Sequence, residues 1–135
     1  MSSANLKQHG GEHYKSRDYQ HWDWVCDTGM HYLLGCATKY VSRWRKKNGV
    51  EDLKKAIHYL EKATEEKVVP PRGLLDRLGR VYPSRFINQH ELTKDRKALE
   101  LIVLASDGDY AEAIGHIEFM IESGVSSQSE PDSEG

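Results

Sequence analysis

Residues 35–60 read GCATKYVSRWRKKNGVEDLKKAIHYL, and they contain two amphipathic helical patterns on either side of Asn48-Gly49. The first pattern predicts a helix over about 31–47, because apolar residues recur there at the spacing of one helix face. The second predicts a helix that begins directly after the glycine, with acidic residues in its first turn, where the helix dipole favours them. A two-residue break between two such helices predicts an antiparallel helical hairpin.

The flanking sequence predicts shorter helices around this hairpin. Their expected ranges are 18–26, 93–105 and 109–123, with another between residue 72 and Pro83. Residues 1–15 are polar and predict a flexible arm, and residues 124–135 have almost nothing to bury and predict a disordered tail. No strand-like alternation is present. The expected fold is therefore all-α, a small helical bundle built on the central hairpin, with a single domain over 16–123.

The composition of the 135-residue chain, 38% hydrophobic and 30% charged, is typical of a globular protein with a heavily charged surface. The formal net charge of −2 makes nucleic acid an unexpected partner, so an anion site has to be local. No run approaches the roughly 20 apolar residues of a membrane span. Cys26 and Cys36 lack the spacing of metal ligands, and no apolar signal core is present, which indicates reduced thiols in a cytoplasm. We expect a soluble cytoplasmic protein without a protein-bound metal.

A basic arc on the first predicted hairpin helix is the main chemical feature of the sequence. On a helical wheel of residues 31–47, an arc of about 80° holds Tyr32, Cys36, Lys39, Arg43 and Lys46. Cations at this spacing repel one another by a few tenths of a kcal/mol per pair. Two alternatives relieve the repulsion. The arc is either a solvated face neutralised by carboxylates such as Glu51, Asp52, Glu61 and Glu65, or it is a site for a bound anion.

Gly35 lies beside this arc in the middle of the predicted helix. A mid-helix glycine costs about 0.5–1 kcal/mol relative to alanine. Close packing of a neighbouring helix and close approach of a ligand are the two explanations that the sequence leaves open. No P-loop and no Gly-x-Gly-x-x-Gly pattern is present, so a phosphate site would have to be built from side chains.

An ordered series of residues runs from the N-terminal arm through both hairpin helices. It comprises His13-Tyr14, Gly35, Lys39-Tyr40, Arg43, Lys46-Lys47, Asp52-Leu53-Lys54-Lys55-Ala56 and Tyr59-Leu60. This series resembles the SaV-like phage family, a domain of unknown function one branch of which is a nucleotide kinase without a Walker motif. The resemblance covers about residues 12–64. Cys36 stands where the family usually has asparagine after the glycine.

The resemblance implies a phage protein in the cytoplasm of an infected bacterium that transfers phosphate from a nucleoside triphosphate to a deoxynucleoside monophosphate. Phosphoryl transfer needs mainly positioning and charge neutralisation. The expected catalytic residues are Asp52, Lys39 and Arg43, with Asp52 orienting a magnesium ion that arrives with the triphosphate. The expected nucleotide-binding residues are His13, Tyr14, Tyr32, Gly35, Lys39, Arg43, Lys46 and Lys55, and Tyr14 or Tyr32 would stack on a base.

Two further hypotheses remain open at this stage. The first is a sponge that sequesters a nucleotide signal of host defence with the same residues and without turnover, and the second is a helical adaptor without a ligand. We also expect a homo-oligomer, because the aromatic residues and apolar stripes exceed what one small bundle covers, and large apolar patches usually mark interfaces.

Overall fold

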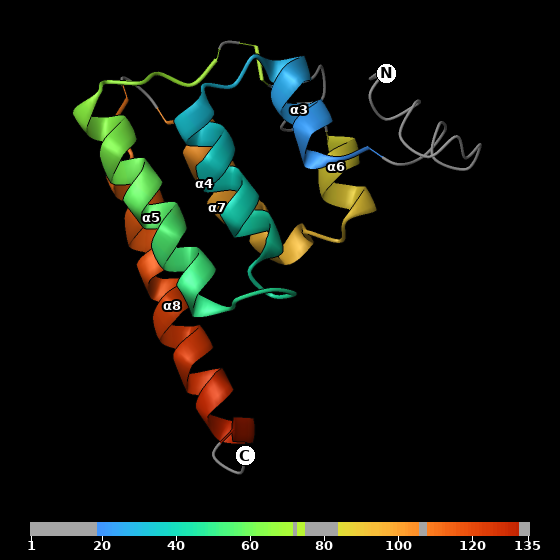
Figure 1. Ribbon diagram of the computed structural model, residues 1–135, viewed down its shortest axis with the longest axis vertical. Helices are drawn as coiled ribbons and strands as arrows, with labels where there is room; N and C mark the ends of the chain where they lie inside the picture. The colour runs from blue at the N-terminus through green and yellow to red at the C-terminus, as the bar shows by residue number, and fades with distance from the viewer. Residues whose placement is uncertain (1–18, 72, 75–83, 106–107, 133–135) are drawn as a thin grey trace.

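A computed structural model describes residues 19–71, 73–74, 84–105 and 108–132, and these residues form a helical bundle (Figure 1). In chain order the elements are α3 (His21–Thr28), α4 (Tyr32–Arg43), α5 (Val50–Glu65), α6 (Ser84–Gln89), the 3-10 helix η1 (Thr93–Asp95), α7 (Arg96–Val103) and α8 (Ala111–Asp132). No strand occurs in the described ranges, so the all-α prediction is confirmed. None of the described helices combines the length and the apolar composition that a membrane span requires.

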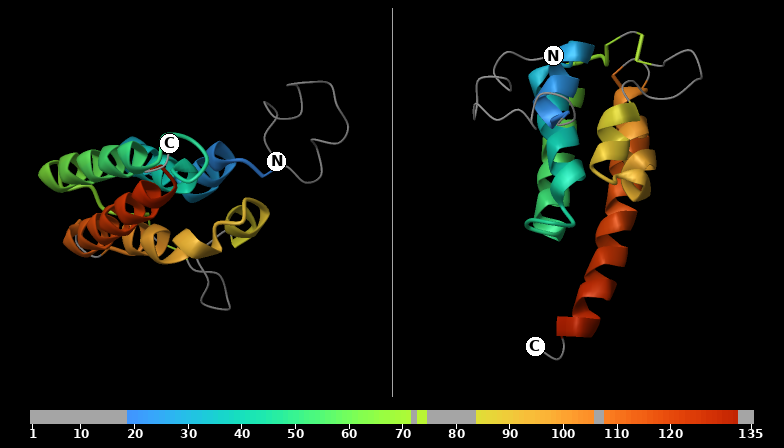
Figure 2. Two further views of the ribbon diagram at one scale, coloured as in Figure 1. Left: turned by 90° about the horizontal axis from the view of Figure 1, so that it is seen from below. Right: turned by 90° about the vertical axis from the view of Figure 1, so that its right-hand side faces the viewer.

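The helices are arranged in two layers, with α3, α4 and α5 in one and α6, α7 and α8 in the other (Figure 2). Across the layers α4 packs on α7 and α5 packs on α8, while α4 and α5 pack closely within their layer. At the end of the bundle the ring of Trp24 in α3 stacks on Phe86 in α6, with centroids 5.0 Å apart. Each helix of the first layer therefore contacts a helix from the second half of the chain. Fully buried residues such as Leu34, Leu60 and Ile117 form the core.

The connection between α4 and α5 is longer than the expected two-residue break. Helix α4 ends at Arg43, and residues 44–49 form a turn that closes at Gly49, whose φ of +63° lies in the left-handed region. The helix stops early because Trp44 turns into the core, where its indole N–H donates a hydrogen bond of 3.2 Å to the buried carboxylate of Asp95. This tertiary bond competes with continuation of the helix.

The C-terminal half shows two further differences from the prediction. Helix α8 continues to Asp132 and projects past the other helices (Figure 1), whereas we expected disorder after Ser123. Gly124 still packs on the ring of Trp44, and a helix that has already formed extends at the gain of one hydrogen bond per residue. Helix α6 is not among the predicted helices, and burial of Phe86 and Ile87 fixes it.

The remaining predictions fall outside the described residues. These are the flexible arm over 1–15 and the short helix between residue 72 and Pro83.

Candidate functional site on the α4 and α5 face

Three cations gather around the ring of Tyr40 on the face shared by α4 and α5. The guanidinium carbon of Arg43 lies 4.9 Å from the ring centroid, and the Nζ atoms of Lys55 and Lys39 lie 5.4 and 5.5 Å from it. The Tyr40 ring also stacks on Tyr59 of α5, with centroids 5.8 Å apart and planes inclined by 14°. We call these five residues the Tyr40 cluster. Attraction of the cations to the aromatic ring offsets part of their mutual repulsion.

The two lysines of the Tyr40 cluster are exposed and form no ion pair among the described residues. No Asp or Glu oxygen in that part of the chain forms an ion pair within 4.0 Å of Lys39 or Lys55. Of the acidic residues of α5 that would neutralise a solvated basic face, Glu51 pairs with Lys54, Glu65 pairs with Lys62, and Asp52 pairs with Arg43 of the arc itself. The positive charge of the two lysines is therefore directed to solvent.

Arg43, in contrast, is held by Asp52, which is fully buried in the first turn of α5. The Nε of Arg43 donates to Oδ2 at 3.3 Å, the backbone N–H of Asn48 donates to the same oxygen at 3.2 Å, and the Asn48 side-chain amide donates to Oδ1 at 3.4 Å. Burial raises the pKa of the Asp52 carboxyl, but the hydrogen bonds from Asn48 and Arg43 together hold it below its usual value. Asp52 is thus a carboxylate that fixes both the 44–49 turn and the position of Arg43.

A phenol, Tyr32, and a thiol, Cys36, adjoin the cluster toward the N-terminus of α4. Tyr32, Cys36 and Tyr40 follow one another at single helical turns, so they share one face. A hydrogen bond with Cys36 raises the pKa of the exposed Tyr32 hydroxyl, and the electrostatic interaction with Cys36 raises the pKa of Tyr59. The α4–α5 face therefore has an aromatic end at Tyr32 and a cationic end at Arg43.

The other predicted site residues lie elsewhere. Gly35 is buried and faces α3, where an added Cβ would meet the two Val25 methyl groups at 3.6 and 3.8 Å, which are ordinary contacts. Lys46 is exposed in the 44–49 turn and is not part of the Tyr40 cluster. His13 and Tyr14 lie outside the described residues. Tyr40, which is not among the expected site residues, is half-buried at the centre of the site. Its place between Lys39 and Arg43 in the sequence was the available signal.

Residues 8–61 match the model of a family described as a protein of unknown function (DUF3310). The matched segment covers nearly the same residues as the expected resemblance, and the family description states neither an activity nor a phage origin. The matched segment contains all five residues of the Tyr40 cluster. No curated protein and no solved structure matches the chain significantly.

Proposed function

We propose that the Tyr40 cluster binds the phosphate groups of a nucleotide. The observation that carries the proposal is the pair of unneutralised lysines, Lys39 and Lys55, over the same ring as an arginine held by a buried carboxylate. Because Asp52 fixes Arg43, the cluster keeps its charges together before a ligand arrives. Preorganised cations of this kind stabilise phosphate with charge-assisted hydrogen bonds.

The aromatic end of the same face suits the base of a nucleotide. Tyr32 is 71% exposed at the start of α4, and Lys39 follows it seven residues later. Seven residues of α-helix rise about 10 Å, so the Tyr32 ring lies about that far along α4 from Lys39. A ligand that lies along α4 would place its base beside Tyr32 and its phosphates over Lys39 and Arg43.

For the reaction, we propose transfer of the γ-phosphoryl group from a nucleoside triphosphate to a deoxynucleoside monophosphate. The bond from the γ-phosphorus to the bridging oxygen breaks, and a bond to an acceptor phosphate oxygen forms, which yields two diphosphates. Lys39, Arg43 and Lys55 would neutralise the charge on the transferred group. Magnesium is usually bound through one or two carboxylates together with the phosphates of the substrate, and the described residues contain no group of three or more His, Cys, Asp or Glu side chains that could hold an ion. We propose that magnesium arrives with the triphosphate, and Asp52 could orient it only by leaving its present donors.

The second candidate is sequestration of a nucleotide without turnover. The specific observation in its favour is the engagement of Asp52, because the carboxylate nearest to the cations is buried and accepts hydrogen bonds at both oxygens. The remaining groups of the face are cations, phenols and a thiol. Such a set binds phosphate and a base, and it needs no further group for sequestration.

Calorimetric titration with nucleoside mono- and triphosphates and with cyclic dinucleotides tests the site. We expect Lys55→Gln to weaken binding about tenfold, the loss of roughly one charge-assisted contact. Lys54→Gln is the matched control, because Lys54 is the preceding exposed lysine of α5 and pairs with Glu51. Equal affinity for the two variants, or no binding of any of these nucleotides to the unmodified protein, would contradict the proposal. Phosphorus NMR of a mixed mono- and triphosphate sample then separates a kinase, which forms diphosphates, from a sponge.

A further inference from the structure

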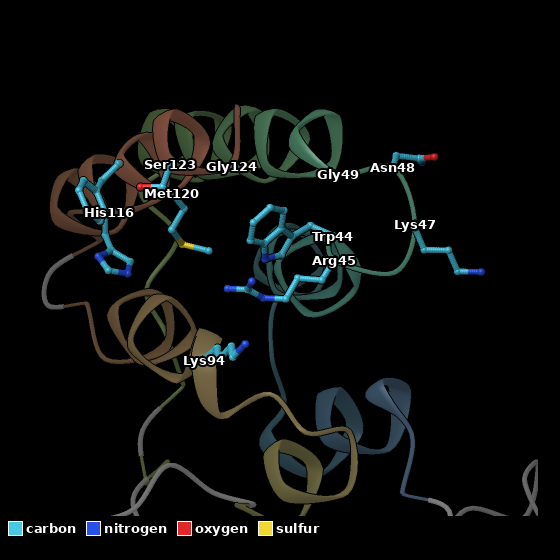
Figure 3. A pocket seen from close by; sticks show the side chains of 11 residues that line it. Trp44, Arg45, Lys47, Asn48, Gly49, Lys94, His116, Met120, Ser123 and Gly124 are labelled. Carbon is cyan, nitrogen blue, oxygen red and sulfur yellow. The ribbon is translucent and has the colours of Figure 1, made fainter. Parts of the chain in front are cut away.

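A cavity of about 720 Å³ opens between the 44–49 turn, η1 and α8 (Figure 3). Small-molecule sites usually have volumes of about 300–1,000 Å³. The cavity shares no lining residue with the Tyr40 cluster, and α8 and η1 lie outside the segment that matches the family model. The cavity is therefore separate from the Tyr40 cluster, and its walls on α8 and η1 come from outside residues 8–61.

The lining of this cavity is cationic. Arg45, Lys47 and Lys94 line it together with His116, and none of the described lining residues is acidic. Figure 3 shows Arg45, Lys94 and His116 around one space, with Lys47 pointing away from it. The nearby carboxylate of Asp95 is 2% exposed and is already engaged.

Arg45 is fixed in place by that buried carboxylate. Its Nε and Nη2 donate to the two oxygens of Asp95 at 3.1 and 3.0 Å, and its guanidinium lies over the Trp44 ring, 4.5 Å from the centroid. Nη1 takes no part in these two bonds. Lys94 forms no ion pair within 4.0 Å among the described residues. The cavity thus presents one rigid and one flexible cation to a ligand.

An apolar wall faces these cations from α8. Phe119 is 64% exposed although its ring is large, and Met120 lies next to it in the lining. The His116 ring lies beside Phe119, with centroids 6.4 Å apart. An exposed phenylalanine beside a cationic cavity is suited to cover the ring of an anionic ligand, because ring contacts bury apolar area while the cations hold the charge.

We propose that this cavity is a second binding site, which takes a small organic anion in which a phosphate group is joined to a flat apolar ring. The phosphate lies against Arg45 and Lys94, and the ring lies against Phe119 and Met120. The site is independent of the Tyr40 cluster, and the proposal goes beyond nucleotide binding at the α4–α5 face.

Titration of the full chain with 1-naphthyl phosphate tests the inference, with inorganic phosphate and 1-naphthol as its two separated parts. We expect the joined compound to bind more tightly than either part. Lys94→Gln should weaken its binding about tenfold, and Ser123→Phe, which fills the cavity from α8, should abolish it. Lys97→Gln is the matched control, since Lys97 is an exposed lysine close in sequence that does not line the cavity. Melting temperatures of all variants verify that they fold.

Three results would overturn the inference. The first is no binding of 1-naphthyl phosphate at millimolar concentration, or binding no tighter than that of inorganic phosphate. The second is unchanged affinity in folded Ser123→Phe. The third is loss of affinity in Lys55→Gln with none in Lys94→Gln, which would assign the ligand to the Tyr40 cluster. If the Tyr40 cluster does not bind nucleotides, the affinity of the cavity for 1-naphthyl phosphate is unaffected. The two proposals can therefore be refuted independently.

Discussion

Two buried aspartates each hold an arginine of the segment that ends α4. Asp52 accepts from Arg43, and Asp95 accepts from Arg45 through two bonds. A buried carboxylate that loses its partner keeps its desolvation penalty, so breaking such a pair is costly even where forming it contributes little. The two arginines therefore have structural roles as well as a place in the two proposed sites.

Arg43→Ala should lower the free energy of unfolding by about 1–3 kcal/mol, because Asp52 stays buried with one donor fewer. If the arc were a solvated face, one of the two alternatives that the sequence leaves open, the same change would leave stability unchanged or slightly higher. Lys46→Ala removes an exposed cation of the neighbouring turn and should change stability by less than about 0.5 kcal/mol. Urea unfolding of the two variants measures the difference, and equal midpoints would show that Asp52 does not depend on Arg43.

His21 should make the protein less stable in mild acid. Burial, with smaller contributions from Lys39 and His90, lowers the pKa of His21 from 6.5 to about 4, and its ring bonds to the Thr38 hydroxyl at 2.9 Å. The imidazole of His21 binds a proton near pH 6.5 in the unfolded chain and only near pH 4 in the folded chain. The stabilisation is therefore complete above pH 6.5 and is lost as the pH falls toward 4, by up to about 3 kcal/mol.

Urea unfolding between pH 7.5 and 4.5 checks this expectation. His21→Gln should flatten the dependence on pH, whereas the matched change at the exposed His58 should preserve it. If His21→Gln retained the pH dependence of the free energy of unfolding seen in the wild type, groups other than His21 would cause it.

At the scale of the helices, glycines in α4 and α8 should differ in their effect on stability. An added Cβ at Gly115 meets nothing within 4 Å, and one at Gly35 makes an ordinary contact, so alanine at either position should stabilise by about 0.5–1 kcal/mol. At Gly124 the added atom lies 3.2 Å from the Trp44 ring, which offsets that gain. Thermal melts should therefore rank Gly124→Ala below the other two. Equal increases in melting temperature for all three variants would mean that the contact between Gly124 and Trp44 does not restrict the position of α8.

Helix periodicity predicted the α4–α5 hairpin and most of the other helices, but it could not place the end of α4. That end depends on the bond between Trp44 and Asp95, which are 51 positions apart in the sequence. No local pattern encodes such a contact. The same reason explains α6, because its six residues are fixed by burial of Phe86 and Ile87 against a distant part of the chain.

The part of the candidate site that lies on a single helix was predictable from the sequence. Lys39 and Arg43 share an arc of α4 that periodicity reveals, and Lys55 entered through the resemblance to a family. Stacking of Tyr40 on Tyr59 was not predictable, because it depends on the register between two helices. The 44–49 turn sets that register.

For the whole molecule, self-association remains a prediction. The large exposed apolar side chains belong to separate segments: Trp22, Tyr32, Val69, Leu104 and Phe119. Sedimentation velocity at micromolar concentration should show a species heavier than the 15.4 kDa chain. If it does, Phe119→Ser and Trp22→Ser identify which surface is used, since each removes one exposed ring. A monomer at all concentrations would contradict the expectation.

The pairing of each early helix with a late one has a consequence for biosynthesis. While the ribosome is still making α7 and α8, the faces of α4 and α5 that pack on these two helices in the complete fold are uncovered. A nascent chain in this state is a candidate for chaperone binding and for aggregation. A fragment of residues 19–71, which holds the whole Tyr40 cluster, should accordingly show no cooperative melting by circular dichroism, and adding the later helices as a separate peptide should restore it.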